Sequence, residues 1–171
     1  EIIYAERARV LNGENMRDAI IKMMNEVIES QVDMFVGDDQ ETKDWDVAGL
    51  SQSLFEIIPV KLEIQKSEIE HLSKAEFKQL LKEAAVKLYE AKEAEFPEPE
   101  HIRELERIVL LRVIDRKWMD HLDDMEQLKQ GIGLMAYGQR DPAVEYKIQG
   151  FEMFNDMIEG IKVETVKTLY H

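Results

Sequence analysis

The sequence contains no cysteine among its 171 residues. Disulfide frameworks, thiol nucleophiles and thiolate zinc sites are therefore excluded together. Positive charge is also scarce, because 22 Lys and Arg stand against 36 Asp and Glu, a formal net charge of −14. Duplex nucleic acid is bound mainly through neutralisation of its phosphates, so this excess of carboxylates argues against nucleic acid as a partner.

Long apolar runs are missing as well. The longest, residues 108–111, is bounded by Arg107 and Arg112 and falls far short of the roughly 18 to 20 residues that span a bilayer. Helix-breaking residues are few, with 4 Pro and 8 Gly, yet hydrophobic residues make up 44% of the chain. This composition supports a packed core rather than disorder. It predicts a soluble, acidic protein of cytoplasmic type.

The first residues already have the apolar spacing of a helix interior. Glu1 is not Met, and Ile2, Ile3 and Ala5 follow it directly. We therefore expect the sequence to be a piece of a larger polypeptide. The first helix is expected over residues 2–12, since an Asn-Gly pair is a favoured helix end.

A second helix is predicted from a cap at Asn15 to Gly37. Its apolar residues recur at spacings of three and four, which is typical of an amphipathic helix. They are Ala19, Ile20, Met23, Met24, Val27, Ile28, Val32 and Phe35. If the chain is a piece of a larger protein, Ile20, Met24 and Val27 are expected to lack partners, which favours self-association.

The next segment contains a loop and an ambiguous apolar stretch. Residues 38–46 are polar and acidic, which predicts a loop. Residues 55–62 are short, β-branched and broken by Pro59, which predicts a short strand or an extended segment.

A third amphipathic helix is predicted over about residues 74–95. Ser67 or Ser73 is expected to cap it, and Pro97 and Pro99 mark a rigid break after it. The acidity lies mostly before this break, because residues 1–100 have a net charge of −11 and residues 101–171 one of −3.

The last third is predicted to form two long helices. From His101, apolar positions recur every three or four residues to Ile132, indicating one helix of about thirty residues. A second stripe runs from Val144 to Leu169. Glycines between them are expected to end the first helix and form a turn; they are Gly131, Gly133 and Gly138. Two such helices joined by a short loop pack antiparallel.

Three groups of residues in this hairpin are candidate sites. Asp120, His121, Asp123 and Asp124 form an acidic cluster around one imidazole; we weigh a weak metal site against a solvated helix face, and favour the face. A stripe with helical spacing is expected to be core rather than a ligand site; it consists of Trp118, Met119, Leu122 and Met125. No glycine precedes a Lys-Ser or Lys-Thr pair, so no phosphate-binding loop is predicted.

The turn between the two helices is the third candidate. Leu134, Met135 and Tyr137 cluster at a tip that has no core of its own. Exposed apolar side chains at a loop indicate contact with a partner, and Met and Tyr together suit varied sequences. The alternative is that the tip folds back on its own helices or rests on another domain.

Residues 112–154, which include WMDHLDDMEQLKQGIGLMAYGQRDP, closely resemble the two-helix finger of the SecA family of bacterial protein-translocase ATPases. DWDVAGL at residues 44–50 resembles part of that family's helical wing domain. ERARVLNGENMRDAII at the start resembles the end of its long scaffold helix.

This resemblance implies a mainly α fold, in which a long antiparallel hairpin packs with a scaffold helix and a small helical wing. Residues 1–36 would belong to the scaffold, residues 37–99 to the wing, and residues 100–171 to the finger and the remainder of the scaffold. No ATPase activity and no cofactor are expected in this chain. ATP and Mg are implied only for motor domains elsewhere in the parent protein.

The resemblance also implies a function in protein export. The finger would contact an unfolded secretory preprotein at the mouth of the SecYEG channel, at the cytoplasmic face of the bacterial inner membrane. It would also couple to, or restrain, the motor and the preprotein-clamping domain. The expected contact residues are Tyr137, Leu134, Met135, Gln139 and Arg140. The alternative is a stand-alone helical dimerisation or adaptor module.

Three positions depart from the family pattern. The family commonly has His and a basic residue where this chain has Gly133 and Met135, and often a basic residue at Ile148. Contacts that depend on those charges are not expected here. The role of Tyr137 carries over best.

Overall fold

The computed structural model describes residues 2–38, 45–60, 72–135 and 141–171, without the side chains of Leu134 and Met135. These residues form six helices and no strand, which confirms the mainly α prediction. The helices are α1 (Ile2–Leu11), α2 (Arg17–Phe35), α3 (Val47–Ile57), α5 (Lys74–Ala94), α6 (Pro99–Met135) and α7 (Pro142–Tyr170).

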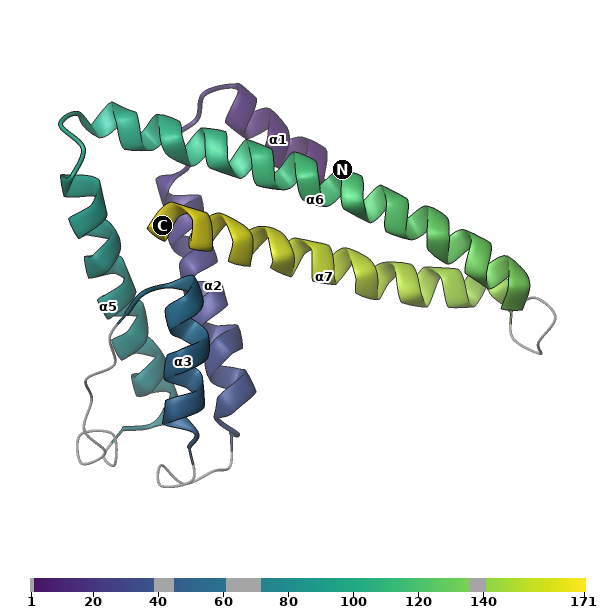
Figure 1. Cartoon of the computed structure of the whole chain (residues 1–171), viewed down its shortest axis with the longest axis horizontal. Helices are drawn as coiled ribbons and strands as arrows, with labels where there is room; N and C mark the ends of the chain where they lie inside the picture. Colours follow the sequence, from purple (N-terminus) through teal and green to yellow (C-terminus); the bar gives the residue numbers. More distant parts are fainter. Residues whose placement is uncertain (1, 39–44, 61–71, 136–140) are drawn as a thin grey trace.

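The helices form two arms that meet at a corner (Figure 1). One arm, the hairpin, consists of α6 and α7 running side by side in opposite directions, with α1 lying along α6. The other arm, the bundle, consists of α2, α3 and α5. Helix α2 connects the arms, because it contacts α3 and α5 as well as α6 and α7.

Side-chain caps fix several helix starts. Ser73 Oγ accepts a hydrogen bond from the N–H of Glu76 at 3.1 Å and so caps α5. Ser73 is one of the two serines that were predicted to cap this helix. Asp46 caps α3 by accepting from the N–H of Gly49 at 2.9 Å. Asn15 Oδ1 accepts from the N–H of Arg17 at 2.9 Å, one residue before the cap position of α2.

Two local predictions were wrong. For residues 55–62 the prediction was wrong at residues 55–57, which are the last turn of α3, because Leu50, Leu54 and Ile57 share one buried face at helical spacing; Ile58 after them is extended, as predicted. Residues 61 and 62 lie outside the described part. Helix α6 also continues through the two glycines that were expected to end it and reaches Met135. Glycine costs a helix only about 1 kcal/mol, and Ile132 between the two glycines is buried.

The core lies in the bundle and at the corner. The predicted stripe of α2 faces inward, and Ile20, Met24 and Val27 are at most 1% exposed. The prediction that these three side chains lack partners was therefore wrong, since α3, α5 and α7 cover α2. That basis for self-association is removed.

The end of α7 closes this core. The hydroxyl of Tyr170 donates to the carbonyl oxygen of Ala85 at 2.7 Å and lies 3.1 Å from the sulfur of Met24. Its ring meets that of Tyr89 edge to face, with centroids 5.6 Å apart. Residues distant in the sequence thus meet at one point.

A buried ionic network holds the two arms at the corner. Glu106 of α6 is fully buried and accepts a hydrogen bond from the hydroxyl of Tyr89 on α5 at 2.5 Å. Arg103 Nε lies 3.2 Å from Glu106 Oε1, an ion pair without hydrogen-bond geometry. Arg103 Nη2 also donates to Glu93 on α5, and Arg17 of α2 donates to both oxygens of Glu93. Three helices are thereby tied together.

Burial and hydrogen bonding shift the pKa values of the two carboxyls in opposite directions. Burial raises the pKa of the Glu106 carboxyl, against the lowering effect of the Tyr89 hydroxyl and of Arg103. At Glu93 burial acts in the same direction, but the hydrogen bonds from Arg17 and Arg103 outweigh it and lower the pKa of that carboxyl. The pKa shifts of Glu106 and Glu93 therefore have opposite signs, although the two carboxyls lie in one network.

Candidate functional site in the distal hairpin

The hairpin projects beyond the bundle and ends at its distal tip (Figure 1). Its 37-residue and 29-residue helices approach closely at Gly150, where an added Cβ would lie 2.9 Å from Met125 Cε. Nearer the tip, Ile132 is buried. The two helices are therefore closely packed at Gly150, and Ile132 is enclosed nearer the tip.

The tip is where α6 ends and α7 begins. Helix α6 ends at Met135, and α7 starts with Pro142 at its first position. Asp141 caps α7, because its Oδ1 accepts from the N–H of Ala143 at 3.0 Å. This cap fixes the chain direction where the tip returns to the hairpin.

The predicted contact residues all belong to this tip segment. The backbones of Leu134 and Met135 lie in the last turn of α6. Tyr137, Gln139 and Arg140 lie outside the described residues. Their part in a contact site remains a prediction.

Apolar side chains are exposed on the distal half of the hairpin. We call them the distal apolar residues: Met119 (67% exposed), Leu122 (50%), Val144 (50%), Ile148 (50%) and Phe151 (66%). Three of them lie on α7 at spacings of four and three, so they share one face of that helix. The prediction that Met119 and Leu122 belong to the core was wrong, while Trp118 and Met125 are half-buried.

The distal apolar residues are exposed for a geometric reason. Two helices bury only the seam between them, and Figure 1 shows no third described helix beside the hairpin beyond the N-terminal end of α1. A sequence signal was available, because apolar residues of α7 between Val144 and Met157 occupy more of the circumference than one seam can bury. Periodicity alone does not separate these two faces.

His121 and the acidic residues around it lie in different surroundings. The imidazole is buried between the rings of Trp118 and Phe154, at centroid distances of 5.5 and 5.8 Å. Asp120, Asp123 and Asp124 are exposed, so the solvated-face interpretation holds for the carboxylates and was wrong for the histidine.

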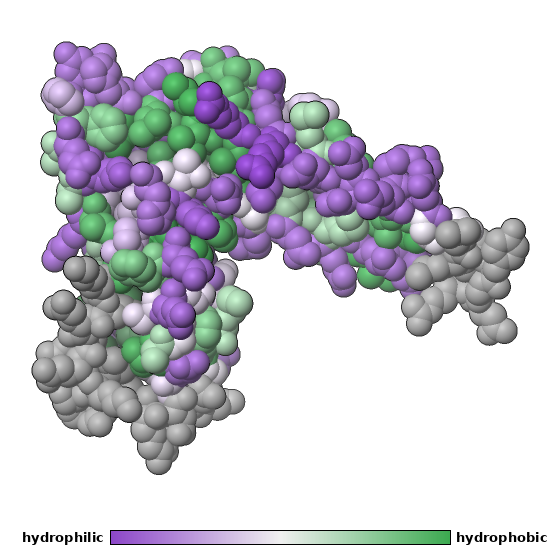
Figure 2. Space-filling model, in the orientation of Figure 1, coloured by the Kyte–Doolittle hydropathy of each residue, from purple (hydrophilic) through white to green (hydrophobic). Residues whose placement is uncertain are grey.

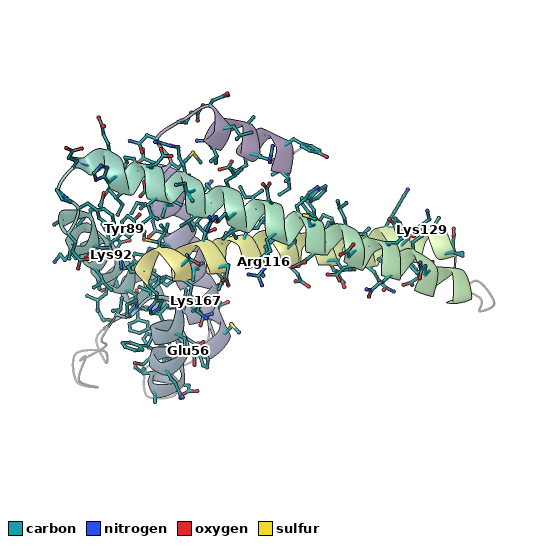
Figure 3. The ribbon with its side chains drawn as sticks, turned by 45° about the horizontal axis from the view of Figure 1, so that its top comes forward. Glu56, Tyr89, Lys92, Arg116, Lys129 and Lys167 are labelled. Atoms are coloured by element: carbon teal, nitrogen blue, oxygen red, sulfur yellow. The ribbon has the colours of Figure 1, made fainter. Side chains whose placement is uncertain are left out.

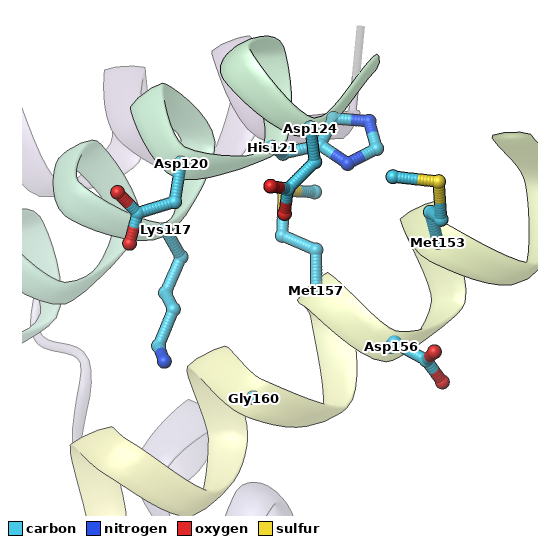
Figure 4. A pocket seen from close by; sticks show the side chains of 8 residues that line it. All are labelled: Lys117, Asp120, His121, Asp124, Met153, Asp156, Met157 and Gly160. Atoms are coloured by element: carbon cyan, nitrogen blue, oxygen red, sulfur yellow. The ribbon is translucent and has the colours of Figure 1, made fainter. Parts of the chain in front are cut away.

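A hollow of about 290 Å³ lies beside this histidine. Figure 4 shows the carboxylates of Asp120, Asp124 and Asp156 pointing in different directions rather than converging on the ring. In the described part of the chain, no group of three His, Cys, Asp or Glu is placed to hold a metal ion.

The middle of α6 is attached to α1. Arg7 Nε donates to Asp115 Oδ1 at 2.9 Å, and the ring of Tyr4 meets that of Trp118 edge to face, with centroids 6.2 Å apart. Both contacts lie on the bundle side of the distal apolar residues. Within the described ranges, no helix has both the length and the apolar character needed to cross a membrane.

Comparison with known proteins identifies this architecture. A family model described as the SecA Wing and Scaffold domain matches residues 1–171. The chain belongs to the SecA wing and scaffold domain family. The resemblance of residues 44–50 and 112–154 to SecA is thereby confirmed.

The most similar relatives include three translocase subunits. A protein translocase subunit SecA of Lachnoclostridium phytofermentans is 60% identical over 172 residues, which cover 100% of this chain and 20% of the relative. The corresponding subunit of Clostridium botulinum is 46% identical, with 100% and 20% covered. SecA 1 of Alkaliphilus metalliredigens is 44% identical, with 100% and 19% covered. The chain spans about a fifth of the length of these relatives.

Proposed function

We propose that this SecA domain contacts an unfolded secretory polypeptide with the tip of its hairpin, at the cytoplasmic mouth of the SecYEG channel. Family membership gives the setting, since the relatives are translocase subunits. The observation that carries the proposal is the position of the tip, at the end of two packed helices that project beyond the bundle (Figure 1). The domain would act peripherally at the inner membrane, on its cytoplasmic face.

Parts of the chain are also assigned to the parts of the family's domain. We assign residues 1–36 to the scaffold, residues 37–99 to the wing, and residues 100–171 to the finger with the rest of the scaffold. The chain would contribute no catalytic group; ATP would be bound and hydrolysed by motor domains elsewhere in the protein. Its finger would couple to those domains or restrain them.

A pusher that acts on any sequence needs an adaptable tip on a stiff support. The packed seam around Gly150 and Ile132 supplies the support. Met and Tyr adapt to different side chains, because the thioether is flexible and the phenol combines an apolar ring with a hydroxyl. Tyr137 with Leu134, Met135, Gln139 and Arg140 is the proposed contact set.

Site-specific photocrosslinking tests this proposal. A photoreactive residue at position 137 of a complete SecA carrying this domain should crosslink to a secretory polypeptide stalled in the channel. The same residue at the exposed position of Glu159, near the base of α7, should not. Crosslinks from 137 only to other SecA domains would make the tip an internal docking element.

The variant Tyr137→Ala separates contact from packing. It should greatly reduce transport of a secretory protein while the melting temperature of the domain stays within the error of the wild type. A large loss of thermal stability would instead identify Tyr137 as a packing residue.

A further inference from the structure

A groove lies between the proximal parts of α6 and α7, away from the tip. Its volume is about 330 Å³. Its apolar lining comes from Leu105, Ile108 and Val109 of α6, and Ile108 is 43% exposed. Figure 2 shows green side chains gathered where the hairpin meets the bundle, with strongly hydrophilic ones beside them.

Three cations border this groove. They are Arg112, Arg116 and Lys117, and Glu164 is the single carboxylate in its lining. Figure 3 shows Arg116 where α6 and α7 run side by side. A positive groove is unexpected on a chain with a net charge of −14.

These cations also differ from the others in their pairing. In the described part of the chain, Arg112, Arg116 and Lys117 have no hydrogen-bonded or ion-paired carboxylate. The other described arginines all have one; they are Arg7, Arg9, Arg17, Arg103 and Arg107. Carboxylates outnumber cations on this chain, so most cations have a carboxylate within reach. The three unpaired cations are therefore a distinguishing feature of the groove.

We propose that this groove binds a short acidic peptide segment of a partner protein. Aliphatic side chains of the segment would cover Ile108 and its neighbours, and its carboxylates would pair with Arg112 and Arg116. Guanidinium groups bind carboxylates through two parallel hydrogen bonds, which suits this role. The inference goes beyond the proposed function, because it concerns a different surface and does not depend on the tip.

The spacing of the two arginines defines the partner further. Residues four apart on a helix lie about 6 Å from each other. Carboxylates at i and i+4 of a helical segment, or at i and i+2 of an extended one, have a similar separation of about 6 to 7 Å. The groove therefore fits a segment with two such carboxylates beside a Leu or Ile.

Nucleic acid is the less suitable anion. Its binding rests on many phosphate contacts, and three cations on a strongly acidic chain supply few. The lining is aliphatic and offers no aromatic ring on which a base could stack. Of these two partners, only a peptide has aliphatic side chains that would cover the apolar lining.

The test is a fluorescence anisotropy titration of residues 1–171, whose core is formed by its own side chains. The probe is a labelled peptide of about twelve residues built from Glu, Leu and Ala, with its glutamates four residues apart. Two matched peptides replace every Glu by Lys or every Leu by Ala. Only the Glu-Leu peptide should bind well, at least about ten-fold more tightly than either control.

Matched variants locate the site. The double variant Arg112→Glu, Arg116→Glu should weaken binding of the Glu-Leu peptide at least about ten-fold. The control Lys129→Glu, Lys147→Glu makes the same change in net charge at exposed, unpaired lysines of the distal hairpin, and should leave the affinity within about two-fold. All four positions are at the surface, and a circular dichroism spectrum verifies folding.

Four results would overturn the proposal. They are absence of binding, equal loss of affinity in both double variants, equal affinity for the peptide without Leu, and displacement of the peptide by a single-stranded oligonucleotide at similar concentration. The second would show general electrostatic attraction, and the last would show an anion site without selectivity for peptide.

Discussion

The bundle and the distal hairpin contain similar amphipathic helices but bury them to different extents. Helix α2 has neighbours on several sides, and its stripe is fully buried. On distal α7 the seam side is half-buried apart from the buried Gly150, whereas Val144, Ile148 and Phe151 are exposed. The same apolar periodicity therefore stabilises the fold in one arm and leaves a surface for contacts in the other. Substitutions in the two arms should separate these roles.

The largest effect is expected in the bundle core. Phe77 of α5 is fully buried and its ring lies 5.3 Å from that of Trp45. Phe77→Ala removes this packing and leaves a cavity, so it should lower the free energy of unfolding by about 3–5 kcal/mol. Urea denaturation followed by circular dichroism measures it. A loss below about 1 kcal/mol would mean that the core relaxes into the cavity.

A smaller loss is expected at the corner between the arms. Tyr89→Phe removes the hydroxyl that donates to Glu106 and leaves a buried carboxylate with one donor fewer. The expected cost is about 1–3 kcal/mol. The control is Tyr4→Phe on α1; Tyr4 is 64% exposed, and loss of its hydroxyl should have no measurable effect. Equal stability of both variants would show that the network adds nothing to the corner.

Acid titration should distinguish the two carboxyls of that network. Glu93→Gln is expected to cost about 1 kcal/mol at pH 7. Because the pKa of Glu93 is lower in the fold than its ordinary value of 4.5, its contribution is complete above that value and is lost as the pH falls through the folded value.

The stability difference between wild type and Glu93→Gln should therefore shrink between about pH 5 and pH 3. Glu106 titrates in both proteins, but Glu93→Gln removes one of the charges that raise the pKa of Glu106, so the contribution of Glu106 is reduced in the difference and not eliminated. A difference that stays constant with pH would assign the effect to packing rather than to charge.

The smallest effect is expected on the distal hairpin. Phe151→Ser replaces a side chain that is 66% exposed, so the free energy of unfolding should change by no more than about 0.5 kcal/mol. Thermal melts at several protein concentrations give this value and also show any change in self-association. A loss of unfolding free energy as large as that of Phe77→Ala would show that the distal hairpin depends on its apolar side chains for stability as much as the bundle does.

Most helices of both arms could be predicted from local pattern. Ser73 before a run of apolar residues at helical spacing predicted α5, and the two long stripes predicted the hairpin. These features depend on neighbours within four residues. The extension of α6 past Gly131 was missed, because tertiary packing at Ile132 outweighs the weak helix propensity of glycine.

The network at the corner could not be predicted in the same way. The one local signal for Glu106 is its place between Ile102 and Val109 at helical spacing on a buried face of α6. Its partners Tyr89 and Arg103 become visible only when α5 and α6 are placed in space. For the tip, the sequence provides the candidates, and Tyr137 lies outside the described residues.

The hydroxyl of Tyr170 has a consequence for the order in which a ribosome completes this domain. It reaches Ala85, 85 residues earlier in the chain, and Met24, 146 residues earlier. Since synthesis proceeds from the N-terminus, α2 and α5 emerge long before the residue that closes the core between them. The nascent bundle therefore has an exposed apolar face during synthesis. A protein that binds exposed apolar surface should associate with this face until Tyr170 has been synthesised and packs against it.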